Sequence, residues 1–192
     1  MFDTDKYTKG LIDFYINFFN KYRYVGNILE IGVLNGGFLD WLLARNQFKK
    51  IIGIDIEKPK RDLSDFTFIK CNQRDADGLR KIAEEHGPFD VIIDDGSHNG
   101  NETVNCFNTL WGYTRGVYFI EDWDVAHLWP GIPGPGDMIT TISNIIQQIP
   151  SLEAKEMMTF YKKVADAGEK ENPGKYLMSV FYLIKNYPQG SI

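Results

Sequence analysis

Hydrophobic residues along this chain follow two spacings, one typical of helices and the other of buried strands. Apolar side chains recur every three or four positions from Leu11 to about Tyr24, which predicts an amphipathic helix. Short, unbroken apolar runs come next, and most are separated by segments with helical spacing. These runs occupy residues 27–33, 50–56, 66–71, 89–94 and 116–122. Strands that are apolar on both faces predict a parallel sheet covered by helices on both sides.

The C-terminal part of the chain has a different pattern. Residues 123–136 contain too many prolines and glycines for regular structure, and they form either a lid or an ordinary stiff connection. Helical spacing over 138–149 precedes two strand-like runs, 152–161 and 176–185, which predict an antiparallel hairpin at the sheet edge. The expected fold is α/β, with a Rossmann-like doubly wound sheet of seven strands that is mostly parallel and ends in this hairpin.

The composition is that of a single globular domain over residues 1–192, with residues 1–26 as a helical cap. Of the 192 residues, 43% are apolar and 24% are charged, and no linker or repeat divides them. A net charge of −5 without a stripe of Lys and Arg argues against nucleic acid as a partner. A homo-oligomer is compatible with this composition.

Two further features concern the cellular compartment. The cysteines, Cys71 and Cys106, lie far apart and form no C-x-x-C pair, which suits a reducing compartment and excludes a cysteine zinc site. The N-terminus is charged from its third residue, and Asp13, Asn17 and Asn20 interrupt the next apolar stretch. No signal peptide or membrane span is visible, so we expect a cytoplasmic protein.

A glycine-rich turn, EIGVLNGG at residues 30–37, joins the first expected strand of the sheet to the next helix. Gly32 and Gly36 would let a ligand approach the backbone, and the helix N-terminus offers amide donors. Asp55 lies about 20 residues further on, where an acid can bind both hydroxyls of a ribose or, alternatively, cap a loop. Together they favour an adenosine-containing ligand, although the turn lacks the full G-x-G-x-x-G pattern.

Four carboxylates follow two buried strands that are expected to be neighbours. Asp94 and Asp95 end the fourth strand, and Glu121 and Asp122 end the fifth. Adjacent anions in a partly dry cleft raise one another's pKa unless a cation compensates, and a hard divalent ion with oxygen ligands does so. Consecutive strand residues point to opposite faces, so all four reach one ion only if the chain turns there.

His98 follows Asp95 in the segment DDGSH, in a loop rather than on an apolar face. That place suits a general base that takes a proton from a bound hydroxyl, although a single histidine is also commonly structural. Coordination to a divalent ion such as magnesium would lower the pKa of the hydroxyl. A hydrolase of the G-x-S-x-G type is excluded because the chain lacks that motif.

Several of these segments resemble a known family. The E-x-G-x-x-x-G turn, the acid after the second strand and the terminal hairpin resemble the class I S-adenosylmethionine-dependent methyltransferases. TDKY, ILEIGVLNGG, IIGIDI, DDGSH and YFIEDW resemble, more specifically, the metal-dependent sugar O-methyltransferases of macrolide pathways, of the mycinamicin type. This closer resemblance covers residues 3–130.

The resemblance implies a site for S-adenosylmethionine. The glycine turn, with Glu30, Gly32 and Gly36, would hold the methionine portion, and Asp55 would hold the ribose.

Two assignments that concern the cofactor have alternatives. A polar residue after the third strand, Gln73 or Asp75, would meet the adenine, but Asp75 is equally suited to be the N-cap of the next helix. The TDKY segment would fold back over the cofactor with Lys6 near a carboxylate, or it would start a helix capped by Thr4 or Asp5.

For the metal, the resemblance implies that Asp95, Glu121 and Asp122 bind Mg²⁺ or another divalent cation. His98, together with Asp95, would be catalytic. Asp94 would then face the cofactor or cap the following helix.

These implications define the expected function. It is a magnesium-dependent O-methyltransferase that uses S-adenosylmethionine on a hydroxyl of a sugar, whether free, nucleotide-linked or part of a glycan or natural product. One alternative is a catechol-type enzyme for small diols; such enzymes usually have Asp-Asn where this chain has Glu-Asp, which favours the sugar group by resemblance. The other alternative is an inactive module that binds S-adenosylmethionine.

Overall fold

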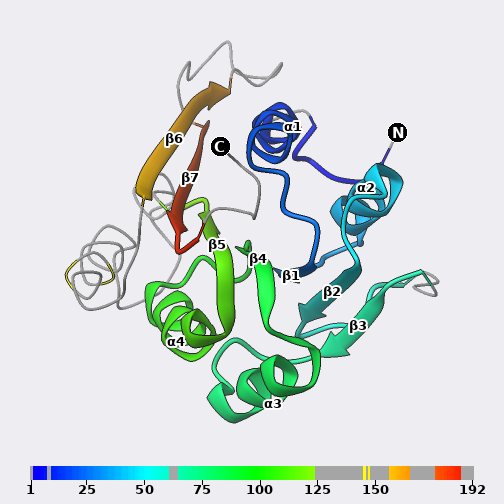
Figure 1. Ribbon diagram of the computed structural model, residues 1–192, viewed down its shortest axis with the longest axis vertical. Coiled ribbons are helices and arrows are strands. Elements are labelled where there is room, and N and C mark those ends of the chain that lie inside the picture. The colour runs from blue at the N-terminus through cyan, green and yellow to red at the C-terminus, as the bar shows by residue number, and fades with distance from the viewer. Residues whose placement is uncertain are drawn as a thin grey trace.

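The computed structural model describes residues 2–7, 10–60, 65–123, 145, 147, 156–164 and 176–186. Across these residues the chain forms a seven-stranded sheet in the order β3-β2-β1-β4-β5-β7-β6 (Figure 1). The strands are β1 (Asn27–Ile31), β2 (Lys50–Asp55), β3 (Thr67–Lys70), β4 (Phe89–Asp94), β5 (Thr114–Glu121), β6 (Glu156–Val164) and β7 (Tyr176–Ile184). The first five run parallel, and β7 is antiparallel to both β5 and β6.

Helices cover both faces of the sheet (Figure 1). α1 (Leu11–Tyr22) and α2 (Gly37–Arg45) pack on one face. α3 (Ala76–His86), α4 (Gly100–Leu110) and the 3-10 turn η1 (Trp111–Tyr113) pack on the other. Alternate residues of one strand serve the two layers: Val91 and Ile93 contact the first, and Ile92 contacts the second. The central strands are apolar on both faces for this reason.

Aromatic side chains fix α1 on the sheet. The ring of Phe18 lies 4.8 Å from that of Phe119 on β5, and the ring of Tyr15 lies 5.4 Å from it, both edge to face. α1 starts after Gly10, whose left-handed backbone (φ 74°) turns the chain back toward residues 2–7. The packing of α1 therefore places the N-terminal segment above the sheet. The expected cap at Thr4 or Asp5 is wrong, because the helix begins at Leu11.

The predicted fold class is confirmed, since the sheet is doubly wound, mostly parallel and has the antiparallel strands β7 and β6 at one edge. Expected and observed strand limits agree within two residues, except that the run expected at 152–161 is the strand Glu156–Val164. The expected lid at 123–136 and helix at 138–149 lie outside the described residues apart from Trp123, Ile145 and Gln147. The assignment to one domain with an N-terminal cap stays a prediction. No helix in the described part of the chain is long and apolar enough to cross a membrane.

The topology creates a crevice at the carboxyl ends of β1 and β4, which are neighbours in the sheet. After β1 the chain leaves for α2 on one face, and after β4 it leaves for α4 on the opposite face. Loops that diverge in this way leave room between them, and open α/β sheets bind ligands there.

Candidate active site

A cavity of about 710 Å³ occupies this crevice. That volume is within the range of small-molecule sites. Its walls come from the ends of the five parallel strands, β1 to β5, and from the N-terminal segment. They include Lys6, Gly32, Asp55, Gln73, Asp95, His98, Glu121 and Asp122.

The glycine turn crosses the cavity close to the end of β4. Gly32 has a left-handed backbone (φ 89°), and a Cβ atom there would lie 2.1 Å from the carbonyl oxygen of Asp95. Gly36 is also left-handed (φ 79°) and directly precedes α2. Both positions therefore favour glycine, Gly32 also because of the nearby Asp95 carbonyl. Close approach of a ligand to this turn stays a prediction.

Asp55 shapes this turn from the end of β2. One oxygen of its carboxylate accepts hydrogen bonds from the amides of Val33 and Leu34, at 2.9 and 3.0 Å. The other oxygen accepts one from the amide of Glu57 at 3.1 Å. Asp55 thus has the loop-capping contacts that the sequence allowed, and it also lines the cavity. Its contact with a ribose stays a prediction.

Glu30 lies buried below the turn and does not line the cavity. Its Oε2 atom has no hydrogen-bond partner among the described residues. Burial raises its pKa well above the usual value, and Lys6 opposes this shift. Glu30 is therefore buried in β1, close to the start of the glycine turn, and its contact with the cofactor stays a prediction.

The two candidates for the adenine contact differ in position. Gln73 lines the cavity and is 6% exposed. Asp75 does not line the cavity; its carboxylate accepts a hydrogen bond from the amide of Gly78 at 2.9 Å and caps α3. The assignment of Asp75 to the cofactor is wrong for this reason, and its alternative as an N-cap is confirmed.

Asp94 points away from the cavity, into the layer of α3 and α4. Its carboxylate accepts hydrogen bonds from Gln73 Nε2 at 2.9 Å and from the Tyr118 hydroxyl at 3.3 Å. Burial raises the pKa of Asp94 to about 7. Neither expected role is found, because Asp94 does not line the cavity and Asn99 caps α4.

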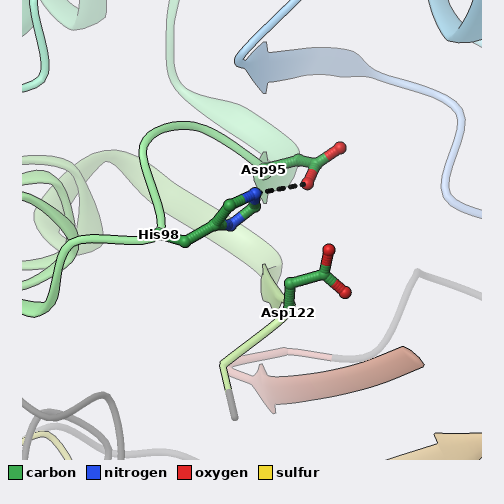
Figure 2. Close-up of side chains that lie close together, drawn as sticks. All are labelled: Asp95, His98 and Asp122. Carbon is green, nitrogen blue, oxygen red and sulfur yellow. Dashed lines mark ion pairs between the residues drawn. The ribbon is translucent and has the colours of Figure 1, made fainter. Parts of the chain in front are cut away.

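Figure 2 shows Asp95, His98 and Asp122 gathered at the ends of β4 and β5. Candidate ligand atoms of these three residues all lie within 4.8 Å of one another. Ligands on opposite sides of an ion bound at about 2.1–2.5 Å lie about 4–5 Å apart, so this spacing fits a divalent cation. His98 Nε2 is 4.0 Å from Asp95 Oδ1. His98 and Asp122 both have left-handed backbones, with φ of 54° and 49°, a conformation that is uncommon for non-glycine residues.

Glu121 is the last residue of β5 and also lines the cavity. Its Oε1 accepts a hydrogen bond from the Tyr15 hydroxyl at 2.6 Å, and its Oε2 accepts one from Lys6 Nζ at 2.8 Å. Burial, followed by repulsion from Asp95, raises its pKa to about 8. Both oxygens therefore have protein partners, and the role of Glu121 as a metal ligand stays a prediction.

Lys6 reaches the carboxylates from the N-terminal segment. It pairs with Asp95 and Glu121 and lies 5.0 Å from the centre of the Phe38 ring. Burial alone would lower the pKa of this ammonium, but Asp95 and Glu121 outweigh burial and raise it. The fold-back of TDKY, with Lys6 near a carboxylate, is what the resemblance implied. The N-terminal segment also lies against the start of α2: a Cβ atom at position 37 would be only 1.9 Å from the carbonyl oxygen of Asp3.

Two contacts of the site were not predicted. Tyr15 belongs to the apolar stripe of the N-terminal helix, and the only signal was a phenol hydroxyl on a face that would otherwise be fully apolar. The amide of Ser97 binds Gln73 Oε1 at 2.7 Å, and no pattern in the sequence indicates that pairing.

Residues 11–121 match the FtsJ-like methyltransferase family. The chain belongs to this family. Among curated proteins it is 32% identical over 160 residues to demethylmacrocin O-methyltransferase of Streptomyces fradiae, which covers 74% of this chain and 40% of that protein. It is 38% identical over 120 residues to L-olivosyl-oleandolide 3-O-methyltransferase of Streptomyces antibioticus, covering 56% of this chain and 30% of that protein.

Solved structures give the same result. The MycE methyltransferase of the mycinamycin biosynthetic pathway, in complex with Mg and SAH, matches with a TM-score of 0.67 and 27% identity. The match covers 94% of this chain and 51% of MycE. The chain thus spans about half the length of MycE and 30–40% of the length of the two curated relatives. The resemblance to macrolide sugar methyltransferases is confirmed.

Proposed function

We propose that this FtsJ-like methyltransferase transfers a methyl group from S-adenosylmethionine to a sugar hydroxyl, with the aid of a divalent cation such as Mg²⁺. The observation that carries the proposal is the cluster of Asp95, His98 and Asp122 in the same cavity as the glycine turn. A cation site next to a nucleotide-type turn is what metal-assisted methyl transfer requires, because the two reactants must be held in contact.

The residues present fit the proposed cofactor. Gly32 has no side chain that could block the approach to the backbone, and Asp55 has its carboxylate at the cavity wall. We assign the methionine portion to the turn at Gly32 and Gly36, the ribose to Asp55 and the adenine to Gln73. The names of the relatives as methyltransferases and the SAH bound in MycE support S-adenosylmethionine as the cofactor.

The residues also fit a divalent cation. Asp95 and Asp122 are proposed as ligands from their spacing, and Glu121 as a third from the resemblance. The cation would lower the pKa of a bound hydroxyl of the acceptor. His98 then has the role of general base, since its ring shares the cavity with both aspartates and is partly exposed to it. Lys6 holds Asp95 from the opposite side.

A sugar is proposed as the acceptor because the relatives are named as methyltransferases of macrolide and tetracenomycin sugars. A small-molecule partner also suits the net charge of −5, which is unfavourable for binding nucleic acid. The experiment must distinguish a sugar methyltransferase from two alternatives: an enzyme that methylates catechol-type diols and an inactive module that only binds S-adenosylmethionine.

The test begins with calorimetric titration of S-adenosylhomocysteine into chelator-treated protein, without and with Mg²⁺. Saturable binding at one site is expected, and Asp55→Ala should weaken it. Transfer of a labelled methyl group is then measured with glycosylated macrolides and with catechol. Turnover of a glycoside that EDTA abolishes supports the proposal. Turnover of catechol alone would identify the alternative enzyme, and binding without any turnover would identify the inactive module.

A further inference from the structure

Gln73 connects the loop that follows β3 to the loop that follows β4. Its Oε1 accepts a hydrogen bond from the amide of Ser97 at 2.7 Å, and its Nε2 donates one to Asp94 Oδ1 at 2.9 Å. Its own carbonyl oxygen accepts a hydrogen bond from Asn105 Nδ2 at 2.5 Å, so the backbone of Gln73 is fixed to α4 as well. The side chain of Gln73 is buried, and its bond to Asp94 is shielded from water.

Only a side chain with an acceptor and a donor on the same planar group fits between these two partners. The amide of Ser97 can only donate, and Asp94 Oδ1 accepts from the side-chain nitrogen of Gln73. The second oxygen of Asp94 is already bound by the Tyr118 hydroxyl, which fixes the carboxylate in place. A glutamine presents its oxygen to Ser97 and its nitrogen to Asp94, whereas a glutamate of the same shape would face Asp94 with a like charge.

Gly96 provides the space for this contact. A Cβ atom at position 96 would lie 2.3 Å from Gln73 Oε1 and 2.5 Å from its Cδ. The glycine is required here by the close approach of the glutamine. The loop thus lies directly against the Gln73 amide.

The loop that Gln73 contacts carries Asp95 and His98. It is tied at its start, where the Asp95 amide donates to the carbonyl oxygen of Ile31 at 2.9 Å, and it ends at Asn99, the cap of α4. Between these points His98 has a left-handed backbone. Such a conformation is strained and persists only where the surroundings enforce it. The middle of the loop is held by the bond of Gln73 to the Ser97 amide, and the Asp94 carboxylate accepts a hydrogen bond from the Gly96 amide.

We propose that Gln73 is a positioning residue, which Asp94 orients and which holds residues 95–98 so that Asp95 and His98 stay in the geometry of the cation site. The inference rests on the proposed function, because it gives the cation site its support. It assigns to Gln73 and Asp94 a role separate from any contact with the adenine.

A double-substitution cycle tests this role with the variants Q73E, D94N and D94N/Q73E. Q73E places two carboxylates against each other. In D94N/Q73E the amide introduced at position 94 can donate to the carboxylate introduced at position 73, so this bond is restored with its direction reversed. The carboxylate at position 73 still accepts from the Ser97 amide. D94N alone keeps an acceptor for Gln73 and completes the cycle. The measurements are hydrogen exchange of the Ser97 amide by NMR, Mn²⁺ affinity by electron paramagnetic resonance, and affinity for S-adenosylhomocysteine.

In Q73E we expect faster exchange at Ser97 and a loss of Mn²⁺ affinity of about tenfold or more, the effect usual for residues that support metal ligands. Both should return toward wild-type values in D94N/Q73E. Wild-type exchange and Mn²⁺ affinity in Q73E would overturn the proposal. So would a double variant as impaired as Q73E. Recovery in the double variant would not come from a repaired adenine contact, because Asp94 does not line the cavity.

Gly96→Ala gives an independent route if Q73E does not fold, because it displaces Gln73 from the loop side. It should reproduce both losses, and wild-type values in G96A would count against the proposal. Failure of the proposed function is seen separately, in wild-type protein that binds neither S-adenosylhomocysteine nor Mn²⁺. Exchange at Ser97 needs no ligand and still reports whether Gln73 holds the loop.

Discussion

Lys6 Nζ lies 2.8 Å from Glu121 Oε2 and so joins the N-terminal segment to the end of β5. The same ammonium pairs with Asp95 after β4, and Lys6 and Glu121 are only 3% and 1% exposed. Buried charges persist when they are paired and hydrogen-bonded. Lys6 thus compensates the carboxylates of Asp95 and Glu121 before any divalent ion binds, and an ion would enter a site in which part of the negative charge is already balanced.

Lys6→Met should destabilise the protein strongly. The substitution keeps the length of the side chain but leaves the buried carboxylate of Glu121 without its cation. Loss of one partner of a buried pair typically costs about 3–5 kcal/mol of the free energy of unfolding, which urea denaturation measures. The matched control is Lys81→Met on the exposed face of α3, where we expect a change within about 0.5 kcal/mol. Equal stabilities of the two variants would show that the Lys6 ion pairs do not stabilise the fold. Added Mg²⁺ should stabilise Lys6→Met more than the wild type.

Tyr15→Phe should have a smaller effect of the same kind. It removes the 2.6 Å hydrogen bond to Glu121 Oε1 and leaves that oxygen buried without a donor. An unsatisfied buried acceptor costs about 1–3 kcal/mol. Tyr113→Phe is the control, because its hydroxyl binds the exposed Glu84 at 3.3 Å. If both variants unfold at the same urea concentration as the wild type, the Tyr15 bond contributes nothing to stability.

Asp94 predicts how stability depends on pH. Burial raises its pKa from the usual 3.8 to about 7, so between these values the folded protein holds a proton that the unfolded chain has lost. Stability should therefore be highest below about pH 4 as far as this group is concerned, and it should fall as the pH rises toward about 7. Urea unfolding of metal-free protein across this range measures the slope, and Asp94→Asn should make it flatter. The same slope in both proteins would contradict the raised pKa of Asp94.

Glu121→Gln tests whether Glu121 is a ligand of the cation or only the buried partner of Lys6 and Tyr15. If Glu121 binds the cation, the variant should lose Mn²⁺ affinity by about tenfold or more, as Asp122→Asn should. The neutral amide can still contact Tyr15, so folding is less affected than by loss of Lys6. Retained Mn²⁺ affinity in Glu121→Gln, with loss in Asp122→Asn, would restrict the ligands to the cluster of Asp95, His98 and Asp122.

Sequence patterns were sufficient for the parts of the molecule that depend on local periodicity. Strand and helix spacing predicted the doubly wound sheet, and parallel strands bring their carboxyl ends to one edge. For that reason Gly32, Asp55 and Asp95 could be placed at one cavity from the sequence alone. Residues that directly follow a strand share an edge of the sheet whatever the details of packing.

Side-chain direction across the sheet could not be read in the same way. Asp94 was expected at the cofactor, but its place in β4 directs it toward Tyr118 in the opposite layer. Asp75 and Gln73 lie two residues apart, yet one caps a helix and the other enters the cavity. Tyr15 and Glu121 meet across 106 residues of sequence. Such contacts depend on how helices seat on the sheet, which the spacing of apolar residues does not specify.

His98→Ala distinguishes a general base from a metal ligand. If His98 takes the proton from the acceptor hydroxyl, methyl transfer should slow by about a hundredfold or more, while Mn²⁺ and S-adenosylhomocysteine bind as in the wild type. Asp122→Asn is the matched comparison, because it should lower Mn²⁺ affinity as well as activity. Both variants are assayed with the glycoside that the wild type methylates, under saturating Mn²⁺. Loss of Mn²⁺ affinity in His98→Ala would make His98 a ligand. The left-handed backbone of His98 would then serve to bring its ring to the ion, and the base would have to be sought among the other groups that line the cavity.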